Sequence, residues 1–386
     1  MVTSVFAVCT ALLLYNYFLY PIAVLLIARL WRPRMRDSLG ASPRGRPFPS
    51  VALIIAAYNE ERVIEAKIRN SLALDYPAAL LRIFVVSDGS TDSTPDIVRR
   101  FHDAGVLSLH QAPRRGKTAA INRATTQAAA DIIVFSDANN MFETTALREL
   151  IKHFEDSKIG GVCGLKQVYN SPDRESTQGD SLYWKYESVI KEAESRIHSI
   201  TTADGEIFAV RRELYEPLDE TVVNDDAEIT LLLVRKGYRV LYERHAVSYE
   251  HASIRIEDDF HVKVRMVAGG FQTVARHWRF LLLPTTWFAV TFVSHKVLRW
   301  LAPELLLLIA FSSIWHAARP FFLAILILQL IFYFLALAGW LTRTSNRRLP
   351  GTYVPFYFCV MNLAALRGLW RFAANTQTTQ WRKAER

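Results

Sequence analysis

The sequence predicts an α/β fold, with a doubly wound parallel sheet in one soluble domain and helices that cross or lie along a membrane. Short apolar runs alternate with helical patterns in the middle of the chain, as the buried strands and crossover helices of parallel sheets do. Polar residues directly follow several of these runs. Apolar residues make up 51% of the 386 residues and concentrate in residues 4–30 and after Phe280, which indicates membrane segments towards both ends.

Apolar runs and turn residues between positions 51 and 249 predict the elements of the sheet domain. The predicted strands are residues 51–57, 81–87, 106–110, 132–136, 160–168, a short segment after Glu206, 240–242 and 246–249. One helix is expected to open at Asn59 as N-cap, and two more to cover residues 118–129 and 180–199. A fourth begins near Asn224 and ends before Gly237, a residue suited to a helix C-terminus.

The apolar segments divide the chain into six parts. We expect an N-terminal transmembrane helix (1–31), a basic linker (32–50), a cytosolic α/β domain (51–260), interfacial helices (261–298), C-terminal transmembrane helices (299–372) and a basic tail (373–386). The first apolar run is about 27 residues long, enough to cross a bilayer. It lacks the basic start of a cleaved signal peptide. Basic residues follow it, so we expect a multi-pass inner-membrane protein with a cytoplasmic domain.

The formal net charge of +9 comes from 46 Lys and Arg against 37 Asp and Glu. Nucleic-acid binding is one explanation of such a charge. Many of the basic residues flank the apolar runs, however, and the positive cytoplasmic flanks of membrane helices explain them better. We therefore expect membrane lipids, and no nucleic acid, as partners. The three cysteines have no metal-type spacing, which disfavours a zinc site and a disulfide framework.

The segment around Asp137 is the centre of the functional prediction. Four apolar residues carry Asp137 to the end of a predicted buried strand, and Asn139 follows two positions later. Residues two apart in a strand point the same way, so Asp137 and Asn139 would reach one point if the strand continued. Two such oxygen ligands suit a hard divalent cation beside phosphate. The alternative is a strand followed by an ordinary Asp/Asn turn.

Two further motifs follow predicted strands. Asp88 ends its strand before Gly89, and it is either part of a surface turn or a carboxylate that accepts hydrogen bonds from a nucleobase. Gly89 would permit a close approach of ligand to backbone. Lys117 follows Arg115 and Gly116 in a turn that is either solvated or binds phosphate. The glycine spacing of a Walker loop is absent.

Two adjacent acids, Asp225 and Asp226, stand at a predicted helix start. One reading is that they cap the helix and stabilise it through the favourable interaction of negative charge with the N-terminal end of the helix dipole. The other is that one of them is a general base. A neighbouring carboxylate raises the pKa of its partner towards a useful range for such a base. Arg265, in the stretch near the membrane, would either meet lipid headgroups or stabilise a leaving phosphate.

The order of these motifs along the chain resembles that of the family-two inverting glycosyltransferases with the GT-A fold. The resemblance is to their membrane-embedded branch, which includes hyaluronan, chitin and cellulose synthases. It implies that the first strand-end motif and the Asp-Gly-Ser aspartate hold the nucleotide, here Ala57, Tyr58, Glu60 and Asp88. It places Lys117 near the diphosphate, and Asp204 near donor sugar and acceptor.

The resemblance also implies a metal site and a base. The Asp-x-Asp motif of the family binds Mg²⁺ or Mn²⁺ and reads Asp137-Ala138-Asn139 here. Asn139 would then be a weaker metal ligand or a nucleotide contact. Of the acid pair, Asp226 matches the base and Asp225 is its neighbour.

One departure concerns the acceptor. The family's Gln-x-x-Arg-Trp motif aligns with residues 262–266, where Arg265 is kept but Val262 and Met266 stand in place of the glutamine and the tryptophan. This disfavours long-chain synthesis.

The expected function is transfer of a sugar from a nucleotide-sugar, with UDP as the expected nucleotide, to a lipid-linked or growing glycan acceptor. The first alternative is a single transfer to lipid, as by a polyprenyl-phosphate sugar synthase or a ceramide glucosyltransferase. The second is a sugar-nucleotide sensor or scaffold without activity.

Overall fold

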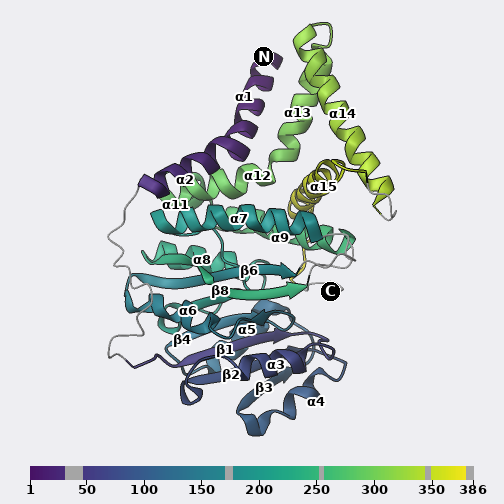
Figure 1. The fold of residues 1–386 in the computed structure, drawn as a ribbon. Coiled ribbons are helices and arrows are strands. Elements are labelled where there is room, and N and C mark those ends of the chain that lie inside the picture. Colours follow the sequence, from purple (N-terminus) through teal and green to yellow (C-terminus); the bar gives the residue numbers. More distant parts are fainter. Residues whose placement is uncertain (31–46, 170–176, 252–255, 344–348, 380–386) are drawn as a thin grey trace.

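The computed structural model describes residues 1–30, 47–169, 177–251, 256–343 and 349–379. In these residues an eight-stranded sheet and its covering helices form one part of the molecule, and long apolar helices form the other (Figure 1). The predicted combination of an α/β sheet with membrane-type helices is confirmed. Most of the predicted linker (32–50) and the end of the basic tail (373–386) lie outside the described residues.

The strands are arranged in the order β3-β2-β1-β4-β7-β6-β8-β5. The four strands from β3 to β4 are parallel, as are β6 and β8, whereas β7 is antiparallel to both of its neighbours and β5 is antiparallel to β8. The strands are β1 (Val51–Ala57), β2 (Leu81–Asp88), β3 (Val106–Gln111), β4 (Ile132–Asp137), β5 (Met141–Phe142), β6 (Ile159–Tyr169), β7 (Phe208–Arg211) and β8 (Arg239–His251).

The register of the parallel strands brings their functional ends together. Ala57 pairs with Ser87, and Ala56 pairs with Asp137. The last residues of β1, β2 and β4 therefore lie side by side at one edge of the sheet, as the alternating pattern predicts.

Both faces of the sheet are buried, which explains why its strands are apolar throughout. In β1, Leu53 and Ile55 belong to one core cluster, and Ile54 belongs to the other. The first face is covered by α3 (Ile64–Leu72), α4 (Thr94–Arg99) and α6 (Ala146–Ile151). The second is covered by α5 (Lys117–Gln127) and α8 (Asp225–Arg235), and further by α10 (Trp278–Leu282) and α11 (Trp287–Phe292). The interfacial segment therefore shares a core with the sheet domain.

Two predicted elements differ from the structure. The two short strands expected at residues 240–242 and 246–249 form the single strand β8, which has an irregular register against β6 where Glu243 is followed by Val247. Asn59 is not an N-cap, because α3 begins only at Ile64. Asn59 instead has a positive φ of 54°, and its Oδ1 accepts a hydrogen bond from the amide of Thr91 at 2.8 Å.

Two helices are long and apolar enough to cross a membrane. The first, Val2–Leu30, comprises α1 (Val2–Leu14), the π-helical turn η1 (Tyr15–Leu19) and α2 (Tyr20–Leu30), and the second is α14 (Pro320–Thr342). A third span exists if the helical segment Trp287–Trp300 and α13 (Ala302–Trp315), which meet at 58°, count as one. The helices α7 (Thr177–Ile197) and α9 (Ile256–Arg276) lie between the sheet and these helices (Figure 1).

The C-terminal part contains helices within the ranges expected as interfacial (261–298) and transmembrane (299–372). Within the expected interfacial segment, a break around Pro284 separates α10 from α11, and α11 continues through the π-helical turn η6 (Val293–Val297) into α12 (Leu298–Trp300). The last helix is α15 (Tyr353–Ala373), which packs along α9. There Gly368 lies against Val267 with no room for a side chain.

Candidate active site

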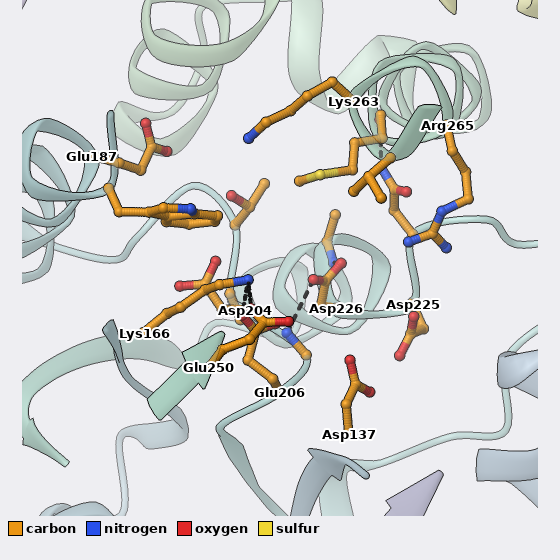
Figure 2. A pocket seen from close by; sticks show the side chains of 18 of the residues that line it. Asp137, Lys166, Glu187, Asp204, Glu206, Asp225, Asp226, Glu250, Lys263 and Arg265 are labelled. Atoms are coloured by element: carbon orange, nitrogen blue, oxygen red, sulfur yellow. Dashed lines mark hydrogen bonds and ion pairs between the residues drawn. The ribbon is translucent and has the colours of Figure 1, made fainter. Parts of the chain in front are cut away.

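A cavity of about 190 Å³ lies between the edge of the sheet and the helices α7 and α9 (Figure 2). Its lining is mostly charged. Asp137, Asp225 and Asp226 lie on one side of it, and α9 brings Lys263 and Arg265 to the opposite side. Six of the predicted site residues line it: Lys117, Asp137, Asp204, Asp225, Asp226 and Arg265. Five do not, and they are Ala57, Tyr58, Glu60, Asp88 and Asn139.

Lys117 and Asp137 form an ion pair in the wall of the cavity. Lys117 is the first residue of α5, and its Nζ lies 2.7 Å from Oδ1 of Asp137 at the end of β4. Burial alone would lower the pKa of Lys117, but the carboxylates of Asp137 and Asp225 raise that pKa above its usual value. Lys117 is therefore a fixed positive charge at the strand ends.

Asp88 anchors the turn that delivers Lys117. The side chain of Asp88 is fully buried, and its carboxylate accepts hydrogen bonds from the backbone amides of Arg115 at 3.1 Å and Gly116 at 2.7 Å. Gly89 has a φ of +68°, and a Cβ there would lie 2.7 Å from the backbone nitrogen of Arg114. The close approach predicted at Gly89 is thus made by protein backbone, and Asp88 faces this turn and not the cavity.

The remaining residues of the first strand end lie beside that turn. Ala57 is the buried last residue of β1. The guanidinium of Arg114 lies over the ring of Tyr58, 3.6 Å from its centroid. The amide of Glu60 donates a hydrogen bond to Oγ1 of Thr94 at 2.8 Å. Tyr58 and Glu60 therefore contact the segments that follow β3 and β2, outside the lining of the cavity.

Asp226 lines the cavity and has a raised pKa. Its Oδ2 accepts a hydrogen bond from the amide of Gly205 at 3.2 Å, and its Oδ1 accepts one from Ala227 at 2.7 Å. Burial and the neighbouring Asp225 carboxylate raise the pKa of Asp226 to about 7, although Lys117 opposes them. Binding of a first-turn helix amide accounts for only part of this side chain's contacts, because Oδ1 accepts the amide of Ala227 whereas Oδ2 reaches the loop before β7.

Asn139 does not join Asp137 at the cavity. The strand ends at Asp137, residues 138–139 form a turn, and Nδ2 of Asn139 donates a hydrogen bond to Oε1 of Glu250 at 2.9 Å. Because the strand does not continue to residue 139, the side chains of Asp137 and Asn139 do not point the same way. The alternative expectation, a strand followed by an Asp/Asn turn, is the one that the structure shows.

Several charged residues at the site were missed by the sequence analysis. Lys166 of β6 pairs with Glu206 at 2.8 Å and with Glu250, and Lys191 of α7 pairs with Asp204 at 2.7 Å. The one sequence feature that could have indicated a role for Lys166 is its position as a charged residue within an apolar predicted strand. Lys191 lies in a charged helical pattern that is typical of a solvated face, so nothing in the sequence marks it as buried.

The residues present fit a divalent cation bound mainly through substrate. The Asp137 side chain is 34% exposed and lines the cavity, so one carboxylate is available. Magnesium commonly binds through one or two carboxylates together with substrate phosphates. Elsewhere in the described residues, Glu149, Glu243 and His245 lie close enough to surround an ion, but Lys152 already pairs with both glutamates.

Residues 52–218 match the sequence model of Glycosyl transferase family 2. The beta-monoglucosyldiacylglycerol synthase of Synechocystis sp. is 24% identical over 284 residues, covering 71% of this chain and 59% of that protein. The poly-beta-1,6-N-acetyl-D-glucosamine synthase of Staphylococcus aureus is 25% identical over 234 residues, covering 58% and 56%. The chain therefore spans less than two thirds of the length of these curated relatives.

A solved structure is similar over nearly the whole chain. The mannosyltransferase PcManGT from Pyrobaculum calidifontis, in complex with GDP-Man and Mn²⁺, superposes with a TM-score of 0.73 at 23% identity and covers 97% of this chain and 100% of that chain. At this identity the likeness establishes the fold. Together with the match of residues 52–218, it shows that the chain carries a glycosyltransferase family 2 domain with the GT-A fold.

Proposed function

We propose that the chain is a membrane-bound inverting glycosyltransferase that moves a sugar from a nucleotide-sugar to a hydroxyl group of a lipid or glycan acceptor. The observation that carries this proposal is the meeting of Lys117, Asp137 and Asp226 in one cavity next to α7 and α9. A cation, a carboxylate suited to metal and a carboxyl group with a pKa of about 7 are the groups that such a transfer requires.

The donor diphosphate would lie beside Lys117 and Asp137, with the nucleotide towards Tyr58 and Asp88. A divalent cation, Mg²⁺ or Mn²⁺, held by Asp137 would offset the negative charge of the diphosphate. The complex of PcManGT with GDP-Man and Mn²⁺ supports this assignment by analogy of fold. We propose UDP as the nucleotide, with GDP as the alternative that the neighbour suggests.

The acceptor would be activated by Asp226. Its Oδ atoms face the cavity, and ionised Asp226 would remove the proton of an acceptor hydroxyl while that oxygen attacks the anomeric carbon from the face opposite the diphosphate. Attack from that face inverts the configuration. Arg265, on the opposite wall, would stabilise the departing diphosphate.

The acceptor side of the cavity favours the transfer of one sugar, or of a few sugars, to each lipid acceptor. Met266 and Trp300 line it, and Arg299 and Lys296 come from the helical segment before α13. The position of the cavity beside apolar helices and the replacement of the family's tryptophan by Met266 both suit a lipid acceptor. The name of the Synechocystis relative is in line with this, whereas that of the Staphylococcus relative points to a polymer.

The test is a screen of the purified protein in lipid nanodiscs. UDP-glucose, UDP-N-acetylglucosamine and GDP-mannose are offered with diacylglycerol, polyprenyl phosphate or oligosaccharide, with Mg²⁺, with Mn²⁺ or with EDTA. Metal-dependent release of nucleoside diphosphate, and a sugar of inverted configuration in the product, support the proposal. An organic-soluble product with one sugar supports a lipid acceptor, and a water-soluble polymer supports a synthase. No release from any donor would favour a sensor or scaffold.

A further inference from the structure

The helix α7 carries three ionisable residues on a buried face. Glu187, Lys191 and Glu194 follow one another at spacings of four and three, so they share one side of the helix. Each exposes at most 2% of its surface. Lysine and glutamate are rarely buried to this degree unless they are paired. The partners of these three residues, here called the buried stripe of α7, therefore show which parts of the protein the helix joins.

On one side the stripe is bound to the membrane-type helices. Glu194 accepts hydrogen bonds from the hydroxyl of Tyr20 at 2.5 Å and from Nδ1 of His295 at 2.7 Å. Glu187 lies 3.1 Å from Nε2 of His295 and 3.0 Å from Arg299, and it also pairs with Lys296. Tyr20 belongs to the first apolar helix. The other partners belong to η6 and α12, so α7 is tied to both segments.

On the other side the stripe reaches the cavity. Nζ of Lys191 lies 2.7 Å from both carboxylate oxygens of Asp204. Burial alone would lower the pKa of Lys191, but Asp204 raises it well above its usual value, so the pair is ionic. The next residue, Gly205, donates its amide to Asp226. Lys191 thus fixes the loop that touches the proposed base.

We infer that Lys191 is a positioning residue for Asp204 and the Gly205 amide, and that α7 makes the geometry of the transfer site depend on the seating of the membrane helices. This inference rests on the proposed function, since it concerns the same cavity. It goes beyond that function in assigning a role to α7 and in predicting that contacts with the first apolar helix, remote from the sugar, affect turnover.

The direct test replaces Lys191 with Met, which keeps the length of the side chain and removes its charge. A misplaced site group can cost about 10²-fold in rate, so we expect kcat to fall by that order. The Kd of the donor's nucleoside diphosphate, measured by calorimetry, should stay within about threefold, because its binding groups are Lys117 and the Asp88 turn. A kcat equal to that of the wild type, or a loss confined to nucleotide affinity, would overturn the inference.

A second pair of variants keeps the test decisive if Lys191→Met does not fold. Tyr20→Phe removes the hydroxyl that binds Glu194, whereas Tyr15→Phe removes a hydroxyl that contacts Oγ of Ser294 at 2.8 Å between the same two helical segments without reaching α7. We expect Tyr20→Phe to lower kcat on the order of threefold to tenfold and Tyr15→Phe to leave it unchanged. Equal kcat values for the two variants would refute the coupling through α7.

The wild-type protein in the same assay separates the two proposals. If it transfers no sugar from any donor, the proposed function fails. If it is active and both Lys191→Met and Tyr20→Phe turn over like the wild type, the proposed function stands and the role of α7 fails.

Discussion

The Oδ2 atom of Asp226 accepts a hydrogen bond from the backbone amide of Gly205 at 3.2 Å. This contact joins the start of α8 to the loop before β7, and a Cβ on residue 205 would lie 3.2 Å from Nζ of Lys117. The proposed base Asp226, this loop and Lys117, which we propose to bind phosphate, are therefore packed against one another. A substitution at Asp226 can therefore change the position of the Gly205 loop and of Lys117 as well as remove the proposed base.

Asp226→Asn should abolish most sugar transfer while donor binding remains. Asparagine keeps the size of the side chain but cannot take a proton, and general base catalysis contributes about 10²- to 10⁴-fold. The measurement is kcat together with the Kd of the donor. Asp225→Asn is the matched control, because it changes the neighbouring acid of the same helix turn, and we expect a smaller loss. Turnover of Asp226→Asn within threefold of the wild type would remove Asp226 from the role of base.

The pH dependence of kcat/KM should report the same group. Burial and Asp225 raise the pKa of Asp226 to about 7, and only the ionised form is a base. The rate should therefore rise with pH up to about 7 and level off above it. Removing the negative charge at position 225 stabilises ionised Asp226, so Asp225→Asn should move this rise to lower pH. A profile that falls between pH 5 and 7 would show that the essential form of the group is protonated.

The parallel part of the sheet and its functional edge could be predicted because they depend on local pattern. Apolar runs such as residues 51–57 are buried on both faces, and parallel strands necessarily end at a common edge. That argument places Asp137 and Ala57 close together without knowledge of any contact. It cannot say which side chains turn into the cavity.

What was missed depends on partners far away in the chain. Asn139 is turned aside by Glu250, 111 residues later, and Asp88 is satisfied by the turn at Gly116. The buried stripe of α7 has the spacing of a solvated helix face, and its burial follows from the placement of Tyr20 and His295. Such pairings carry no periodic signal, so the sequence placed Asp88 and Asn139 at the donor and assigned no role to the stripe of α7.

Asp88→Asn should weaken donor binding through the loop and also destabilise the fold. The amide group of asparagine would present N–H atoms to the backbone amides of Arg115 and Gly116, which now donate to a carboxylate. Leaving such a buried donor unsatisfied costs about 1–3 kcal/mol. We expect a lower Tm and a higher donor KM, measured by thermal unfolding and initial rates. Asp96→Asn, on the exposed surface of α4, is the control and should change neither quantity. A normal Tm with a raised KM would instead place Asp88 on the nucleobase.

Metal binding should depend on Asp137 and not on a restored Asp-x-Asp motif. Asp137→Asn removes the carboxylate that lines the cavity, so the affinity for Mn²⁺ in the presence of nucleoside diphosphate should fall on the order of tenfold or more. Asn139→Asp recreates the motif, but it sets a second carboxylate against Glu250, which now accepts the Asn139 amide at 2.9 Å. Like charges in a buried site repel, so this variant should lower the Tm without tightening metal binding. Calorimetric titration with Mn²⁺ and thermal unfolding measure both effects. Tighter Mn²⁺ binding by Asn139→Asp would mean that residue 139 turns towards the metal when the donor is bound, and the contact with Glu250 would then belong to the ligand-free state alone.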